Sequence, residues 1–182
     1  MIDKASSAAP QKQVSIFIGE NNSIASRTGT AFLQTAATPV KQLGMAGYSE
    51  TPLAQKLGIN PFMTVTVMNE PAGYRKLLGQ TAKGVTFSDR AGRDCGFIHF
   101  FTTRRSELEN QLKKLRSKIA DTGVLWVSWP KKSAGVPTDV TEDVIRAVAL
   151  PLGFVDVKVC AVDETWSGLK LMIRRENRKA AK

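Results

Sequence analysis

The feature that most constrains the fold is a strand, a helix and a second strand that follow one another between residues 96 and 129. Residues 96–102, GFIHFFT, are almost continuously apolar, as expected of a strand that is covered on both faces. Residues 124–129 are again apolar and rich in strand-forming residues. Between them, apolar residues recur at the spacing of one helix face, at Leu108, Leu112, Leu115 and Ile119. Two strands joined by a crossover helix lie parallel, so this segment predicts an α/β sheet.

Two capping signals predict where the longer helices begin. Ser106 with Glu109 three residues later forms a capping box for the first helix. Asp139 with Glu142 predicts the start of a second helix that ends near Gly153. The chain is expected to turn at residues 121–123 between the first helix and the strand at 124–129.

Shorter elements complete the predicted domain. The alternating run MTVTVM predicts a first buried strand, and a terminal pair of strands around a turn predicts an antiparallel hairpin. The expected helices are 51–57 and 74–78, and the expected strands are 63–68, 85–87, 155–162 and 169–174, with the hairpin turn at 163–168.

The domain organisation follows from changes in composition. Residues 1–44 are rich in Ala, Ser, Thr, Gln and Asn and predict a flexible N-terminal extension. Residues 45–175 predict a single α/β domain, and residues 176–182 a basic C-terminal tail. We expect the natural start to be Met45, a hypothesis that an intact amino terminus at Met1 in mass spectrometry of the native protein would contradict.

The composition excludes several classes of protein. No apolar run approaches the roughly 20 residues that span a bilayer, so no membrane partner is expected. Cys95 and Cys160 lie in strand-like sequence without metal-ligand or pairing spacing, which predicts reduced thiols and a cytoplasmic setting. With His99 as the single histidine, no zinc site can be assembled, and no Ser/His/Asp or Cys/His arrangement is recognisable.

The formal net charge of +10 is concentrated in two places. From residue 170 onward, six basic residues stand against one acidic residue, and between residues 104 and 118 six stand against two. Such clusters are typical of solvated helix faces and tails. They also allow a surface that binds nucleic acid or an acidic protein partner.

The order of the elements resembles the class I methyltransferases, which have a Rossmann-like sheet, mostly parallel and flanked by helices, that finishes with an antiparallel strand. The local likeness is greatest at DCGFIHFF, the leucine-striped helix and ADTGVLWVSW. More specifically, MAGYSETPLAQKLGI and LWVSWPKKSAGVPTDVTEDVIRAVALPLGFVDVKVCAVDETWSGLKL resemble an uncharacterised bacterial family known only as a domain of unknown function. That resemblance spans residues 45–175 and implies a fold without an established activity.

The methyltransferase resemblance implies a cofactor site for S-adenosylmethionine. In that family a glycine-rich turn follows the first strand, and an acidic residue at the end of the second strand binds ribose hydroxyls. Here the turn is Asn69-Glu70-Pro71-Ala72-Gly73, with one glycine and a proline that fixes φ, whereas Asp89 matches the acidic position. The sequence therefore predicts a degenerate cofactor loop, and whether the protein is an enzyme stays open.

Ligands of open α/β sheets bind beyond the carboxyl ends of the strands, and the candidate residues are those that the pattern brings there. Lys131 and Lys132 offer ammonium groups for a phosphate or carboxylate, or form a solvated loop with acidic neighbours. His99 is a candidate acid or base, or a hydrogen-bonded core residue. The full predicted set is Asn69, Glu70, Asp89, His99, Ser128, Trp129, Lys131 and Lys132.

The tryptophans have different expected roles. Trp126 and Trp129 alternate on one strand and so face opposite sides, with Trp126 in the core and Trp129 either packed or presented to a ligand ring. Trp166, in the predicted hairpin turn, either docks onto the domain or marks a partner surface.

Two hypotheses follow. The first is a methyltransferase-like domain that binds a small anionic or nucleotide-like ligand at the strand ends. The second is a non-enzymatic binding module that contacts nucleic acid or an acidic protein through its basic helix and tail.

Overall fold

Six strands form one sheet in the order β2-β1-β3-β4-β6-β5. The structure is a computed structural model and describes residues 51–178, so the predicted extension 1–44 and the last four residues of the tail lie outside the described residues. β1 to β4 pair in parallel, whereas β6 runs antiparallel to both β4 and β5. This confirms the mostly parallel sheet with a terminal hairpin. The strands are β1 Thr64–Met68, β2 Thr86–Ser88, β3 Cys95–Phe101, β4 Ile119–Pro130, β5 Phe154–Ala161 and β6 Trp166–Ile173.

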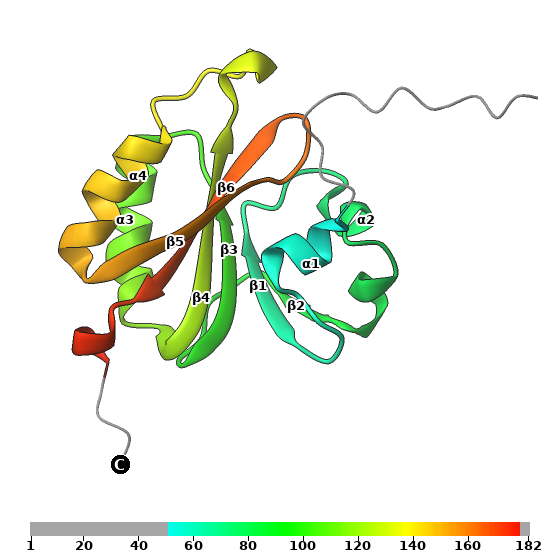
Figure 1. Cartoon of the computed structure of the whole chain (residues 1–182), viewed down its shortest axis with the longest axis horizontal. Coiled ribbons are helices and arrows are strands. Elements are labelled where there is room, and N and C mark those ends of the chain that lie inside the picture. The colour runs from blue at the N-terminus through cyan, green and yellow to red at the C-terminus, as the bar shows by residue number, and fades with distance from the viewer. Residues whose placement is uncertain (1–50, 179–182) are drawn as a thin grey trace, which may run out of the picture. The chain divides into compact units, whose positions relative to one another are not determined.

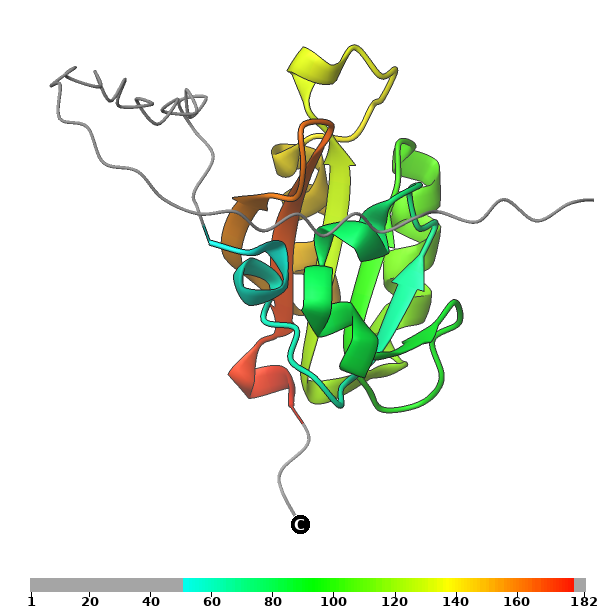
Figure 2. The same ribbon diagram turned by 90° about the vertical axis from the view of Figure 1, so that its right-hand side faces the viewer.

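Helices cover both faces of the sheet (Figure 1). Residues of α1 and α2 pack on one face, which we call the α1/α2 face, and residues of α3 and α4 pack on the other, the α3/α4 face (Figure 2). The helices are α1 Leu53–Leu57, α2 Tyr74–Leu77, α3 Arg105–Arg116 and α4 Glu142–Ala149, and the 3₁₀ turns are η1 Gly79–Gly84, η2 Lys132–Ala134, η3 Leu150–Leu152 and η4 Arg175–Asn177.

The two tryptophans of β4 mark the two halves of the core. Trp126 is fully buried in the cluster of the α1/α2 face, and its indole N–H donates to the Leu57 carbonyl at 3.0 Å. Trp129 lies in the cluster of the α3/α4 face and is 8% exposed. The predicted alternation is confirmed, and both indole rings pack in the core.

Both predicted capping boxes are wrong, for one physical reason. Asp139 does not cap α4. Its Oδ1 accepts the backbone N–H of Arg105 at 2.6 Å, so it satisfies a free donor in the first turn of α3. α3 therefore begins one residue before Ser106, without a side-chain cap of its own. α4 begins later than predicted, behind Thr141, whose hydroxyl accepts the Val144 N–H at 3.3 Å.

One predicted turn is strand throughout, and a second is strand in its latter half. β4 begins at Ile119, so residues 121–123 belong to the sheet, and Ile119 pairs with Cys95. Gly123 is required here because a Cβ would lie 2.7 Å from the Cys95 carbonyl oxygen. β6 begins at Trp166, inside the predicted hairpin turn. There the indole packs edge-on against Phe101 with ring centroids 5.2 Å apart, so Trp166 docks onto the domain.

The sheet is not covered evenly. Along β1, Val65 and Val67 point into the core of the α1/α2 face. Thr64 and Thr66 point the other way, because side chains alternate along a strand. The chain between β2 and β3 is the short segment 89–94, which contains no helix. The α3/α4 face therefore presents hydroxyl groups rather than a packed helix at β1 and β2.

Candidate functional site

The strand order reverses between β1 and β3. The chain leaves β1 for the edge strand β2 and then returns to β3 on the other side of β1. In open α/β sheets, ligands bind beyond the carboxyl ends of the strands at such a reversal. A cleft of about 390 Å³ lies there, which we call the strand-end cleft. It is lined by Asn69, Phe101, Thr102, Thr103, Arg104, Glu107 and Trp166.

A carboxylate held by two side chains forms one wall of the strand-end cleft. Glu107, in the first turn of α3, accepts the Asn69 amide N–H at 2.9 Å on Oε1 and the Thr102 hydroxyl at 2.7 Å on Oε2. The Asn69 amide also donates to the Phe101 carbonyl at 2.9 Å. Asn69 has φ +54°, a left-handed conformation that asparagine tolerates better than most residues. The end of β1, the end of β3 and the start of α3 are thereby joined.

A cation and an aromatic ring complete the cleft. Arg104 is exposed and immediately precedes α3, and within residues 51–178 its guanidinium forms no hydrogen bond or ion pair. Trp166 is half-buried and held by Phe101. The cleft thus presents a carboxylate, a guanidinium and an indole to a ligand.

Of the predicted site residues, only Asn69 lines the strand-end cleft. Glu70 forms an ion pair with Arg75, with three N–H···O contacts between 2.9 and 3.1 Å. The Arg75 guanidinium in turn lies 4.5 Å from the centre of the Phe87 ring. Asp89 is exposed directly after β2 and is not among the cleft residues.

His99 and Ser128 belong to a buried network on the α1/α2 face. His99 Nδ1 lies 2.7 Å from the Tyr74 hydroxyl, and His99 Nε2 lies 2.7 Å from Ser128 Oγ. Burial lowers the pKa of His99 to about 3, so the imidazole is neutral at physiological pH. Burial also raises the pKa of Tyr74 far above its usual value. All three groups are neutral and hydrogen-bonded, as expected of a polar network inside a core.

The predicted residues at and after the end of β4 do not line the strand-end cleft. The Lys131 ammonium donates to the Asp163 carbonyl at 2.6 Å, which ties it to the β5–β6 turn. Lys132 is exposed in η2. Trp129 packs in the core of the α3/α4 face. None of these residues lines the strand-end cleft together with Asn69.

The sequence did contain a signal for the residues that were missed. Thr102, Thr103 and Arg104 come directly after the apolar strand GFIHFF, which is where a parallel strand presents polar groups to a ligand. Glu107 was passed over because the capping-box prediction assigned its neighbours Ser106 and Glu109. Trp166 was placed in a turn because Ser167 and Gly168 resemble turn residues.

No helix among residues 51–178 is long and apolar enough to cross a membrane. No protein-family model matches the chain. No curated protein matches it either.

Solved structures do match, and several of them are described as methyltransferases. An S-adenosylmethionine-dependent methyltransferase from Aquifex aeolicus aligns with 67% of this chain and 88% of its own, at 16% identity and a TM-score of 0.50. A putative type 11 methyltransferase from Sulfolobus solfataricus aligns with 71% of this chain and 95% of its own, at 13% identity and a TM-score of 0.49. The chain therefore has a methyltransferase-like α/β fold, and the similarity extends to the fold alone.

Proposed function

We propose that this protein is a methyltransferase-like domain that binds a small anionic or nucleotide-like ligand in the strand-end cleft. The observation that carries the proposal is the position of the cleft at the reversal of strand order between β1 and β3. Its volume of about 390 Å³ falls in the range of small-molecule sites.

The groups in the cleft favour a ligand with three chemical features. Arg104 offers a paired donor geometry to a phosphate or carboxylate. Glu107 accepts hydrogen bonds from hydroxyl or amino groups, and its orientation is fixed by Asn69 and Thr102. Trp166 offers an aromatic surface to a base. Nucleotides combine all three features, and S-adenosylmethionine combines them with a carboxylate in place of the phosphate.

S-adenosylmethionine is the more demanding candidate. The loop after β1 contains Pro71 and one glycine, Gly73, which has φ +83°. Glu70 in this loop is held by Arg75. We therefore rank a nucleotide or a phosphorylated metabolite above S-adenosylmethionine, and methyl transfer as an activity below binding alone.

Calorimetric titration tests this proposal. S-adenosylmethionine, S-adenosylhomocysteine, AMP and ATP are titrated into the full chain and into Arg104→Ala. We expect one of these ligands to bind, and Arg104→Ala to weaken that binding about tenfold, the loss of one charge-assisted contact. Arg175→Ala is the matched control, since it removes the same charge from η4. Absence of binding by all four ligands, or equal losses in both variants, would contradict the proposal.

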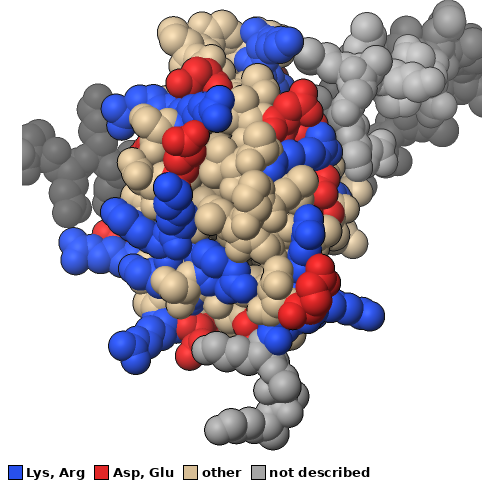
Figure 3. Space-filling model, turned by 90° about the vertical axis from the view of Figure 1, so that its left-hand side faces the viewer, with Lys and Arg blue, Asp and Glu red and all other residues tan. Residues whose placement is uncertain are grey.

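A second candidate function, binding of nucleic acid, is favoured by a contact that joins the two basic clusters of the sequence. Arg116, at the end of α3, donates to the Leu152 carbonyl at 3.1 Å and to the Asn177 carbonyl of η4 at 3.3 Å. The basic end of α3 and the basic C-terminal segment are therefore adjacent. Figure 3 shows Lys and Arg side chains gathered across the side of the molecule that carries α3 and α4. We call the basic residues in the last turn of α3 and at η4 the basic surface, namely Lys113, Lys114, Arg116, Arg175 and Arg178.

A salt-dependence measurement tests the second candidate. Affinity for a short RNA or DNA should fall steeply with salt. Lys113→Ala/Lys114→Ala should weaken it and reduce the salt slope. The double variant Lys76→Ala/Lys83→Ala removes the same charge from α2 and η1, on the other face of the sheet. Equal effects of the two double variants would indicate a response to net charge and would contradict a defined surface.

Two finer assignments are proposals as well. A cytoplasmic setting is supported by the two cysteines, both of which are free. Membership of the uncharacterised bacterial family is supported by the motifs of residues 45–175, and an acidic protein remains an alternative partner for the basic surface.

A further inference from the structure

A second hollow lies on the part of the sheet that no helix covers. It has a volume of about 360 Å³ and opens on the α3/α4 face at β1, β2 and the start of β3. We call it the hydroxyl pocket. It is lined by Thr64, Thr66, Ser88, Arg90, Gly92, Arg93, Asp94, Cys95, Gly96 and Phe97. None of these residues lines the strand-end cleft, so the two sites are separate.

The floor of the hydroxyl pocket is polar for a reason that the sequence contains. Val65 and Val67 of β1 fill the core of the α1/α2 face, so the intervening Thr66 points to the opposite face. There its hydroxyl oxygen lies 4.0 Å from Cys95 Sγ, which is the outer limit for a hydrogen bond that involves sulfur. Thr64 and Ser88 add two further hydroxyls from the paired strands β1 and β2. Apolar residues would be expected at these positions if a helix packed against them.

One wall of the pocket is the loop of residues 89–94, which contacts of Ala91 and Ser88 hold in place. Ala91 is buried in the core of the α3/α4 face, and its carbonyl accepts the Lys118 ammonium at 3.0 Å. The Ser88 hydroxyl donates to the Arg90 carbonyl at 2.9 Å and accepts the Arg90 N–H at 3.3 Å. The loop is thus ordered before any ligand arrives, which reduces the entropy lost on binding.

The charge of the pocket favours an anion. Arg90 and Arg93 line it and are exposed, and within residues 51–178 no carboxylate forms an ion pair with either guanidinium. Asp94 lines it as well, so the pocket keeps one net positive charge. Space is also open beside the backbone, because a Cβ on Gly92 or Gly96 would meet no atom within 4 Å.

We propose that the hydroxyl pocket binds the phosphate group of a small phosphorylated molecule. Arg90 and Arg93 supply the positive charge and paired donors, and the Thr64 and Thr66 hydroxyls donate to the remaining oxygens. A small molecule is favoured over a polymer, because the pocket is a hollow between one loop and the sheet. This site is independent of the strand-end cleft, and neither proposal requires the other.

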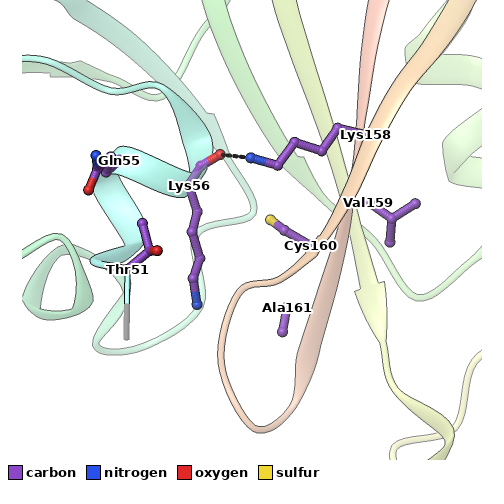
Figure 4. Close-up of a pocket in the computed structure, with 7 residues that line it drawn as sticks. All are labelled: Thr51, Gln55, Lys56, Lys158, Val159, Cys160 and Ala161. Atoms are coloured by element: carbon purple, nitrogen blue, oxygen red, sulfur yellow. Dashed lines mark hydrogen bonds between the residues drawn. The ribbon is translucent and has the colours of Figure 1, made fainter. Parts of the chain in front are cut away.

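A pocket beside β5 can be compared with the hydroxyl pocket. It also contains a cysteine, Cys160, and two basic residues, Lys56 and Lys158 (Figure 4). There, however, the Lys158 ammonium donates to the Lys56 carbonyl at 3.1 Å, so part of its donor capacity is used within the protein. The chain therefore contains two half-buried thiols, each beside two basic residues, of which only Cys95 lies in the proposed site.

Alkylation of the two thiols tests the proposal within a single molecule. The full chain is treated with iodoacetamide, a neutral reagent, at increasing concentrations of inorganic phosphate or pyrophosphate, with sodium chloride at equal ionic strength as reference. Mass spectrometry follows Cys95 and Cys160 separately. We expect a saturable slowing, severalfold at saturation, at Cys95 alone. Arg90→Ala/Arg93→Ala should abolish the protection, whereas Lys76→Ala/Lys83→Ala, which removes the same charge from α2 and η1, should retain it.

Pyrophosphate titration by calorimetry gives a second readout that does not depend on thiol reactivity. The arginine pair of the pocket should account for at least a tenfold change in affinity, and Thr66→Val for a smaller one. Three results would each overturn the proposal: no saturable binding of either anion, equal protection of both cysteines, or equal losses in the arginine double variant and the lysine double variant.

Discussion

Two polar clusters on neighbouring parts of the sheet have similar chemistry and different surroundings. In one, His99 lies between the hydroxyls of Tyr74 and Ser128. In the other, Glu107 lies between the Asn69 amide and the Thr102 hydroxyl. His99 is 0% exposed, whereas Glu107 lines an open cleft. Hydrogen bonds that exclude water specify a core, and similar bonds at a strand end orient a group toward a ligand.

The largest effect is expected from breaking the buried cluster. His99→Leu leaves the Tyr74 and Ser128 hydroxyls buried without their partner, so we expect the free energy of unfolding to fall by about 3 kcal/mol. Urea unfolding followed by circular dichroism measures it. Tyr74→Phe removes one bond and should cost less. A loss below about 1 kcal/mol for His99→Leu would show that the network contributes little.

The second prediction concerns pH. The pKa of His99 is about 3 in the folded protein and about 6.5 when unfolded. Between these values the unfolded chain binds a proton that the folded chain does not. The free energy of unfolding should therefore fall as pH drops below 6.5, by up to about 1.4 kcal/mol per pH unit.

A histidine-free variant isolates this pH effect. His99 is the chain's single histidine, so His99→Gln should remove the slope between pH 6.5 and 5. The hydrogen bond from Arg146 lowers the pKa of Asp156. Protonation of this carboxylate therefore also lowers the free energy of unfolding, but at lower pH. An unchanged slope in His99→Gln would exclude His99 as its source.

A smaller effect is expected in the open cluster, at Asn69. Asn69→Ala removes two hydrogen bonds and places alanine at φ +54°, so we expect a loss of about 1–2 kcal/mol. Asn69→Gly removes the same bonds without the backbone strain and should be the more stable of the two. Thermal unfolding compares them, and equal stabilities would mean that the left-handed conformation carries no strain.

The smallest effect on stability is expected from Glu107→Gln, which keeps the shape and one of the two acceptor oxygens while removing the charge. We expect a change within about 0.5 kcal/mol, because the side chain is partly in water. Its effect on ligand affinity in the strand-end cleft should be larger than its effect on unfolding. A large destabilisation would place Glu107 with the buried cluster rather than with the binding site.

The sequence predicted the strands and helices better than the contacts between residues that are far apart in the chain. Apolar runs and the leucine stripe identified β3, α3 and β4 because burial repeats with the period of each element. The opposite faces of Trp126 and Trp129 followed from the same periodicity. Asp139 was assigned to the wrong helix because a carboxylate and an N–H that bond across the chain leave no local signature. The strand-end cleft was missed in part for that reason, since its members come from β1, β3, α3 and β6.

The bond between Asp139 and Arg105 also bears on the order in which the protein is made. It spans 34 residues, so the start of α3 leaves the ribosome well before the carboxylate that caps it. Thr138 makes a second bond between the same two segments, because its hydroxyl donates to the Thr103 carbonyl at 2.9 Å. The backbone on either side of Arg104 therefore gains these two contacts only after the segment that precedes α4 has been synthesised. A nascent chain that stops short of that segment already contains every residue of β1 and β3, but not yet the contacts that complete the cleft between them.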